Sequence, residues 1–542
     1  MTDPATHQQT HPKPASTPRK SIRWWPAILI LLVTAGALIA IRSQDQLPFQ
    51  KRNLQSLAAL AGSTACLAIW WLLLSRTTLT LRFAVVGLTL TLTAITAATI
   101  RIRGVTGDLI PILEFRWKSS PPKQNHALET TTPPTPTDSY EYIIQTAQTD
   151  FPQFLGPNRN ATLQHIQLNP DWTGNPPQIL WKHPIGTGWS GFSIVGKIAI
   201  TQEQRGPMEC VSAYNASTGE LLWSHQDETQ YNTVIAGEGP RATPTIDNNY
   251  TYTLGATGLL NCLKTATGEL VWQHDITKDA ECSVPEWGFS GSPLLYNNLV
   301  IVIAGGNNGR SLLAYNAQSG KLAWSGGDAG ASYSSPFLTT IDNQQQIIAF
   351  NSRQIVSHNP TNGSVLWTYP WGKGFPHVSI PIPVQSNQLL FSSGYGVGAE
   401  LLQITPPSPQ TNSWQADRIW KSGRMKAKFS NLVSKDGFAY GLDDGILACI
   451  KLTDGSQAWK EGRYGHGQGL LIGDHYLLMA EDGRLLLLQP TPNEPNLLHE
   501  FPVFDSKTWN PIALAGNLLL VRNDLEAAAL KIAIQPSPAS QP

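Results

Sequence analysis

Cysteine is scarce in this sequence, with five residues among 542. Small secreted domains that depend on disulfides carry far more, so a disulfide framework is excluded as the basis of this fold. The length and a hydrophobic content of 41% instead allow a sizeable buried core and more than one domain.

Net charge is also missing. Lysine plus arginine (38) equals aspartate plus glutamate (38), and only 14% of the residues are charged. Nucleic-acid-binding proteins usually carry a basic excess, so this balance argues against a nucleic-acid partner. The sequence also lacks P-loops, dinucleotide-binding fingerprints, nucleophile elbows and standard metal-ligand spacings, and we therefore predict no metal site.

The zero net charge is the sum of two unequal parts. Residues 1–118 carry 13 basic and 4 acidic residues, whereas residues 119–542 carry 25 and 34. The net charges are therefore +9 and −9. An asymmetry of this size indicates that the two parts of the chain lie in different environments.

Three apolar runs of 18 residues without a charge lie in the basic part: Trp24 to Ile41, Leu57 to Leu74 and Phe83 to Ile100. An 18-residue helix rises about 27 Å, close to the roughly 30 Å of a bilayer core, so we predict three membrane spans. The first run would also fit a cleaved signal peptide. The two spans that follow immediately favour an uncleaved anchor.

Tryptophan pairs mark the ends of the first two runs. Trp24-Trp25 begins the first run and Trp70-Trp71 lies near the end of the second, so both pairs would lie at one face of the bilayer in a helical hairpin. The two sides of the membrane would hold six and seven basic residues, and charge does not decide the orientation. The Pro/Thr-rich segment Ser119 to Ser139 is predicted to be a stiff tether.

A repeat fills the acidic part. Each copy has an apolar strand, a turn that ends in glycine and a short strand that ends in tryptophan. The repeated tryptophans are Trp181, Trp223, Trp272, Trp324, Trp367, Trp420 and Trp459. Periods of roughly 40 to 50 residues with strand-like content are those of β-propeller blades, in which each tryptophan would pack between neighbouring sheets. Cys262 and Cys449 occupy a small-residue position of the repeat and are predicted to be packed interior side chains.

The repeat predicts eight blades. The seven tryptophans mark seven outer strands, and LLHEFPV near Phe501 reads as a degenerate eighth. Leu525 to Ile534 has the pattern of a third strand without a fourth after it, and PPQILWKHP around Trp181 would complete that blade. Closing the ring in this way removes exposed sheet edges. The predicted fold class is therefore all-β, an eight-bladed β-propeller preceded by an N-terminal three-helix transmembrane region.

Five further segments accompany the repeat. They are FPQFLGPNRN (Phe151 to Asn160), GPRATP (Gly239 to Pro244), WGFSGSPLL (Trp287 to Leu295), RYGHGQ (Arg463 to Gln468) and TWNPIAL (Thr508 to Leu514). Together with the repeat they resemble the bacterial PQQ-like (pyrroloquinoline quinone repeat) propeller family, which includes BamB-type assembly lipoproteins and quinoprotein alcohol dehydrogenases. The resemblance covers about residues 150–534 and is specific for fold rather than for activity.

For an enzyme, the resemblance implies a quinone on the propeller axis. Calcium would be chelated there by Glu, Asn and Asp, with an aspartate base, a tryptophan below the ring and often a vicinal disulfide above it. This chain has no adjacent cysteines, and no local cluster stands out as the calcium set. We therefore expect no cofactor, and PQQ with calcium stays open as the alternative.

A ring of candidate binding residues follows from aligning the first strands of the blades. A small residue followed by proline recurs there, and first strands line the central channel of a propeller. The residues just before this pattern are Trp189, Arg241, Trp287, Tyr333, His377, Lys428, His466 and Trp509. Aromatic faces beside cationic or imidazole groups would suit a flat or anionic ligand. The alternative is that these residues simply pack against loops at the strand starts.

The sequence favours a membrane-anchored binding or scaffolding module without enzymatic activity, with protein partners at the propeller loops. Two alternatives stay open, a membrane-bound PQQ-dependent alcohol or sugar dehydrogenase and a small-ligand sensor. Family resemblance implies a multi-pass protein of a bacterial inner membrane, with the propeller on the extra-cytoplasmic side. The predicted domains are a basic tail (1–23), three transmembrane helices (24–100), a juxtamembrane segment with the linker (101–149), the propeller (150–534) and a disordered tail (535–542).

Overall fold

The computed structural model describes residues 21–44, 47–117, 146–233, 235–372, 376–385 and 387–535. The predicted tether Ser119 to Ser139, residues 1–20 of the basic tail and all but the first residue of the C-terminal tail lie outside these residues. The chain divides into two compact units. The helical unit comprises Met1–Arg103 and Leu113–Trp117, and the propeller unit comprises Gly104–Ile112 and Lys118–Pro542.

The helical unit contains the three predicted long apolar helices. They are α1 (Trp25–Arg42), α2 (Phe49–Ile69), which continues as the π-helical turn η1 (Trp70–Leu74), and α3 (Leu79–Thr99). Each is long and apolar enough to cross a membrane. The hairpin of β1 (Ile100–Val105) and β2 (Pro111–Phe115) follows α3 directly.

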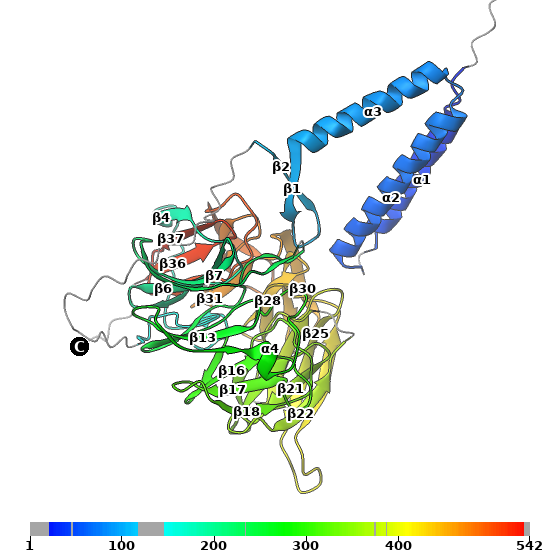
Figure 1. Ribbon diagram of the computed structural model, residues 1–542. Helices are drawn as coiled ribbons and strands as arrows, with labels where there is room; N and C mark the ends of the chain where they lie inside the picture. The colour runs from blue at the N-terminus through cyan, green and yellow to red at the C-terminus, as the bar shows by residue number, and fades with distance from the viewer. Residues whose placement is uncertain are drawn as a thin grey trace, which may run out of the picture. The chain divides into compact units, whose positions relative to one another are not determined.

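Helices α1 and α2 lie side by side (Figure 1). The predicted tryptophan pairs meet, since the rings of Trp24 and Trp70 are 5.6 Å apart. The Trp70 indole donates a hydrogen bond of 3.0 Å to the carbonyl of Arg23. Between the helices, Thr34 Oγ1 donates to Ser63 Oγ at 2.8 Å. These contacts confirm the predicted helical hairpin.

The propeller unit contains the eight predicted blades (Figure 1). Seven are four-stranded antiparallel sheets, and the remaining one has a fifth strand that pairs in parallel with its inner strand. The first two blades, from inner to outer strand, are β5 (Ser193–Val195), β6 (Ile198–Arg205), β7 (Met208–Asn215), β8 (Leu221–Asp227) and β11 (Thr245–Asp247), β12 (Tyr250–Leu254), β13 (Leu259–Lys264), β14 (Leu270–Asp275). The next two are β15 (Leu294–Tyr296), β16 (Leu299–Ile303), β17 (Leu312–Asn316), β18 (Leu322–Gly326) and β19 (Phe337–Ile341), β20 (Gln344–Phe350), β21 (Gln354–His358), β22 (Val365–Pro370).

The second half of the ring follows the same plan. Its first two blades are β23 (Ile382–Pro383), β24 (Gln388–Ser393), β25 (Gly398–Thr405), β26 (Gln415–Ser422) and β27 (Val433–Lys435), β28 (Phe438–Asp443), β29 (Ile446–Lys451), β30 (Gln457–Arg463). The last two are β31 (Gln468–Ile472), β32 (His475–Met479), β33 (Arg484–Gln489), β34 (Asn496–Pro502) and β35 (Ala513–Ala515), β36 (Leu518–Arg522), β37 (Glu526–Lys531), β4 (Gln178–Pro184). The short strand β3 (Thr162–Leu163) is the fifth strand of the β31–β34 blade and pairs in parallel with β31. Strands β9 (Asn232–Thr233) and β10 (Gly237–Glu238) form a separate two-stranded sheet, and α4 (Ile276–Asp279) is a single short helical turn.

The last blade closes the ring as predicted. Strand β4 comes from the N-terminal end of the propeller and pairs antiparallel with β37 from its C-terminal end, with Trp181 opposite Ala529. The segment before β4 is also bound to the propeller. Its buried Arg159 donates hydrogen bonds to the carbonyls of Ser292 (3.0 Å) and Pro293 (2.9 Å). Burial lowers the pKa of Arg159 to about 9.

The repeated tryptophans join each blade to the next. Trp223 of one blade donates 3.0 Å from its indole N–H to the carbonyl of Thr265, in the glycine turn of the following blade. Trp181, Trp272, Trp420 and Trp459 make the equivalent bond at 2.8 to 3.0 Å. In these five blades both the apolar ring and its polar N–H are therefore satisfied at the junction. Trp367 instead donates to Gln346 of its own blade at 2.8 Å, and the Trp324 N–H has no hydrogen-bond partner among the described residues.

The small residue of each repeat faces the tryptophan across the sheet. Cys262 pairs with Trp272 and Cys449 with Trp459, and a β-bulge follows each pair. Both thiols are free and fully buried, so the predicted packing role of these cysteines is confirmed.

The repeat glycine is needed for two reasons. Gly268 has φ +73°, and a Cβ at this position would overlap Cε3 of Trp223 from the preceding blade. Glycine therefore permits both the turn and the close approach of the ring.

We expect Gly268→Ala to lower the free energy of unfolding by roughly 1–3 kcal/mol more than Gly196→Ala. Gly196 also has a positive φ, +56°, but an added Cβ there meets nothing within 4 Å, so the control carries the backbone strain without the clash. Urea unfolding of the detergent-solubilised full-length protein measures both variants. Equal losses would contradict a packing role for the glycine.

Candidate functional site

A cavity of about 130 Å³ opens at the starts of the inner strands, and we call it the funnel. Five of the eight predicted residues line it: Trp189, Arg241, Trp287, Tyr333 and Trp509. Phe154, Phe429, Asn431 and Gln468 are among the other lining residues. The repeat alignment thus brings residues of separate blades into one place.

Aromatic rings form two sides of the funnel. Trp287 stacks on Tyr333 with ring centroids 5.1 Å apart, and Trp189 lies 4.9 Å from Trp509. Phe429 connects the two pairs at 6.2 Å from Trp287 and 5.1 Å from Trp509. A planar apolar group in the cavity would meet ring faces or edges on several sides, which favours an aromatic ligand.

Arg241 supports the rim rather than offering a free charge. Its guanidinium donates to the carbonyls of Ala236 (3.1 Å) and Gly237 (3.0 Å) and lies 4.5 Å from the Tyr231 ring. The Trp189 indole donates to Ala236 as well, at 2.8 Å. Burial lowers the pKa of Arg241 to about 10. Arg241 therefore holds the loop that forms one wall of the funnel.

His377 does not line the funnel. Its imidazole is buried, stacks on Phe350 at 4.5 Å, and contacts Ser393 Oγ and the Ser352 carbonyl at 3.0 and 3.1 Å. Burial lowers its pKa to about 4, so the ring is neutral at pH 7. The alternative interpretation, packing at a strand start, holds for this residue.

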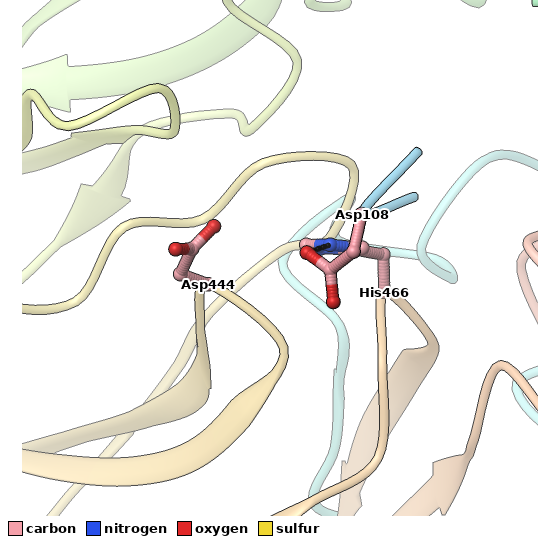
Figure 2. A group of neighbouring side chains, drawn as sticks. All are labelled: Asp108, Asp444 and His466. Atoms are coloured by element: carbon pink, nitrogen blue, oxygen red, sulfur yellow. Dashed lines mark hydrogen bonds and ion pairs between the residues drawn. The ribbon is translucent and has the colours of Figure 1, made fainter. Parts of the chain in front are cut away.

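Lys428 and His466 do not line the funnel either. Both lie next to Phe429, with Lys428 Nζ 5.3 Å and the His466 ring 5.4 Å from its centroid. They surround Asp108, a residue of the segment Gly104–Ile112 that belongs to the propeller unit. Figure 2 shows Asp108 beside the imidazole of His466, with Asp444 on a neighbouring loop.

Asp108 is buried in positive surroundings. Its carboxylate contacts His466 Nε2 at 3.3 Å and Arg463 Nη1 at 3.1 Å. Burial alone would raise the pKa of Asp108, but the hydrogen bond from His466 and the charges of His466, Arg463 and Lys428 outweigh it and lower the pKa below its usual value. Asp108 is therefore ionised at neutral pH.

Asp108, Asp444 and His466 have ligand atoms close enough to hold a metal ion. Arg463 Nη1, however, donates to Asp108 Oδ2 and to the Asp444 carbonyl. Lys428 adds a second positive charge that interacts with both carboxylates. Because these cations already compensate the carboxylates, we assign no metal to the group.

Sequence reasoning missed Asp108, Phe429, Arg463 and Glu481. Asp108 lies between the long apolar helix α3 and a Pro/Thr-rich segment, where no pattern indicates a contact with the propeller. Phe429 directly follows the predicted Lys428, and Arg463 lies in the RYGHGQ segment that contains His466. Those two could have been found by extending the alignment by a few residues.

Comparisons with known proteins agree with this architecture. Residues 207–461 match the family model described as outer membrane protein assembly factor BamB. Among curated proteins, none matches the chain. The quinohemoprotein alcohol dehydrogenase from Comamonas testosteroni is 14% identical, covers 73% of this chain and 82% of its own, and has a TM-score of 0.53.

Two further solved structures are similar. The quinohemoprotein alcohol dehydrogenase from Pseudomonas putida HK5 is 12% identical, with coverages of 73% and 82% and a TM-score of 0.50. BamB from Moraxella catarrhalis is 15% identical, with coverages of 66% and 98% and a TM-score of 0.46. The chain thus contains a β-propeller whose residues 207–461 match the family model, in agreement with the resemblance.

The funnel does not fit the calcium–quinone arrangement. Among the described residues that line it there is no aspartate or glutamate. Glu481 lies next to Trp509, but its oxygens accept hydrogen bonds from the Trp509 indole (3.0 Å) and from the backbone N–H groups of Gly107 (2.7 Å) and His466 (2.9 Å). Calcium needs several free oxygen ligands, which this wall does not supply.

We expect the stability of the wild type to fall as pH drops from about 6.5, the ordinary pKa of histidine, to about 4, because His377 is then protonated in the unfolded chain but not in the folded one. His377→Gln removes this contribution and flattens that part of the profile. Urea unfolding at several pH values measures it, with the exposed His165→Gln as control. Parallel profiles for wild type and His377→Gln would contradict a buried neutral imidazole.

Proposed function

We propose that this protein is a membrane-anchored binding module whose propeller takes a flat aromatic ligand in the funnel. The observation that carries the proposal is the aromatic lining: Trp189, Trp287, Tyr333, Phe429 and Trp509 come from different blades and border one cavity. Trp189 is 7% exposed and the other four rings are partly exposed. Their remaining apolar surface is covered when a ligand ring enters, which favours binding.

The size of the funnel limits the ligand. A cavity of about 130 Å³ suits a single aromatic ring, since an engineered cavity of about 150 Å³ binds benzene. Asn431 and Gln468 add amide groups at the wall. A one-ring compound with a polar substituent is therefore the ligand class that the lining supports.

The outer strands support a scaffolding role as a second candidate. Each blade ends in a strand that pairs on one side only. Several of these strands expose apolar residues, namely Ile179, Leu180, Leu270, Val271, Leu322, Val365, Ile419 and Leu497. An unpaired strand edge with exposed apolar side chains can add a strand from a protein partner.

We expect 4-nitrobenzamide, a neutral one-ring probe, to bind the detergent-solubilised full-length protein saturably. Trp287→Ala and Trp509→Ala should each weaken binding by roughly three- to tenfold, because each removes one stacking face. Titration calorimetry measures the affinity. Trp414→Phe is the matched control, since Trp414 packs elsewhere in the propeller. Absence of saturable binding in the wild type would refute the funnel as a ligand site.

We further propose a bacterial inner membrane with the propeller outside the cytoplasm. Three spans then place the N-terminus inside and the turn between α2 and α3 inside as well. Alkaline phosphatase fused to the C-terminus should be active and green fluorescent protein at the same point dark, whereas fusions after Arg76, in the α2–α3 turn, should give the reverse. A fluorescent C-terminal fusion with inactive phosphatase would place the propeller in the cytoplasm.

A further inference from the structure

The segment Gly104–Ile112, which we call the tip, belongs to the propeller unit although only the four residues 100–103 separate it from α3 in sequence. Gly107 and Asp108 are buried, Asp108 to 5% exposure. The tip forms its own tight turn, with the Thr106 N–H donating to the Ile110 carbonyl at 2.9 Å. A short acidic turn from outside the blades is thus inserted into the propeller.

Arg463 and His466 contact the Asp108 carboxylate, and the charge of Lys428 acts on it as well. We call these three side chains of the propeller the cage. Lys428 is 1% exposed and His466 fully buried. His466 and Arg463 contact one carboxylate oxygen each, at 3.3 and 3.1 Å. Arg463 is 36% exposed, so the buried cation of the cage is Lys428, whose charge interacts with Asp444, Asp108 and Glu481. A buried cation is stabilised by nearby anions, which favours a carboxylate at the position of Asp108.

The backbone of the tip is held as specifically as its carboxylate. The Gly107 N–H donates to Glu481 Oε1 at 2.7 Å, and Lys428 Nζ donates to the Gly107 carbonyl. Lys507 Nζ donates to the Val105 carbonyl at 3.3 Å. The tip therefore occupies the cage in the way that a bound peptide would.

The cage and the funnel share a wall. Phe429 and Trp509 line the funnel, while Lys428 and His466 contact the Phe429 ring. Glu481, which holds the tip, also accepts the Trp509 indole N–H. Lys507 lies 4.0 Å from the Trp509 ring centroid and reaches the tip backbone. A ring stacked on Trp509 would therefore place a substituent close to the position of the Asp108 carboxylate.

We propose that the cage is the carboxylate-binding end of the funnel and that the tip occupies it as an internal ligand, which an aromatic carboxylate displaces. The inference rests on the proposed aromatic site and adds the anionic group to its ligand class. Displacement frees the segment that joins the propeller to α3 in sequence, so occupancy of the funnel is coupled to the release of that segment.

Two glycines of the tip provide matched variants. An added Cβ at Gly107 would overlap Cδ2 of His466, so Gly107→Ala expels the tip without changing any charge. An added Cβ at Gly104 has Lys507 Nζ as its nearest neighbour at 3.9 Å, so Gly104→Ala leaves the tip in place. Hydrogen exchange of residues 104–112 in the full-length protein should be slow in the wild type and Gly104→Ala, and fast in Gly107→Ala.

Binding is measured with 4-nitrobenzoate against its neutral analogue 4-nitrobenzamide. We expect Gly107→Ala to bind the benzoate at least about tenfold more tightly than the wild type, because the carboxylate of the probe then makes the charge-assisted hydrogen bonds that the tip makes in the wild type. The benzamide should gain far less. Adding Lys428→Met to Gly107→Ala should remove the gain for the benzoate alone, and saturating benzoate should speed exchange of the tip in the wild type.

The outcomes separate the two proposals. Equal gains for both probes would show a merely steric block and overturn the carboxylate site. Benzamide binding with no benzoate advantage in Gly107→Ala would overturn the inference and leave the aromatic site intact. Failure of both probes in every variant would overturn both proposals. If EDTA treatment makes hydrogen exchange of the wild-type tip fast, a metal ion bound by Asp108, Asp444 and His466 holds the tip. This result would overturn the proposed cage.

Discussion

The antiparallel pairing of β4 with β37 is the contact on which the rest of the propeller depends. It joins the two ends of the propeller into a closed ring and covers strand edges that would otherwise be open. The same junction builds the site. Trp189 follows β4 in the chain and Trp509 precedes β35, yet closure brings their rings to 4.9 Å. Without it, the funnel would lose one of its two aromatic pairs.

Within the ring, one interaction recurs between neighbouring blades. A tryptophan packs on the glycine turn of the following blade and donates its N–H to a carbonyl there, as Trp223 does to Thr265. This explains why the repeat combines a glycine, a small residue and a tryptophan. The blade of β31 to β34 departs from the pattern, since His499 stands at the tryptophan position opposite Leu487 and stacks on Trp172 at 6.0 Å. Its outer strand was predicted from the spacing of the repeats and not from a tryptophan.

The interior of the propeller contains charges as well as apolar side chains. Lys428 and Asp108 are both buried, and each compensates the other's loss of water. The carboxylate comes from a segment outside the blades, whereas the cations come from the blades and their loops. The anion and the cations of this cluster therefore belong to two parts of the chain that can move apart. The residues of an ion cluster within one blade cannot.

Local sequence patterns determined the three apolar helices, the eight blades, the strand that closes the ring and five funnel residues. Each of these depends on spacing along the chain, and a propeller repeats its spacing. The tertiary structure decided the rest. The His377 imidazole is buried, where it stacks on Phe350 and contacts Ser352 and Ser393. Lys428 and His466 lie near Asp108 and do not line the funnel. That contact spans more than 300 residues and follows no period, so burial of charge, rather than any local pattern, placed the tip in the propeller.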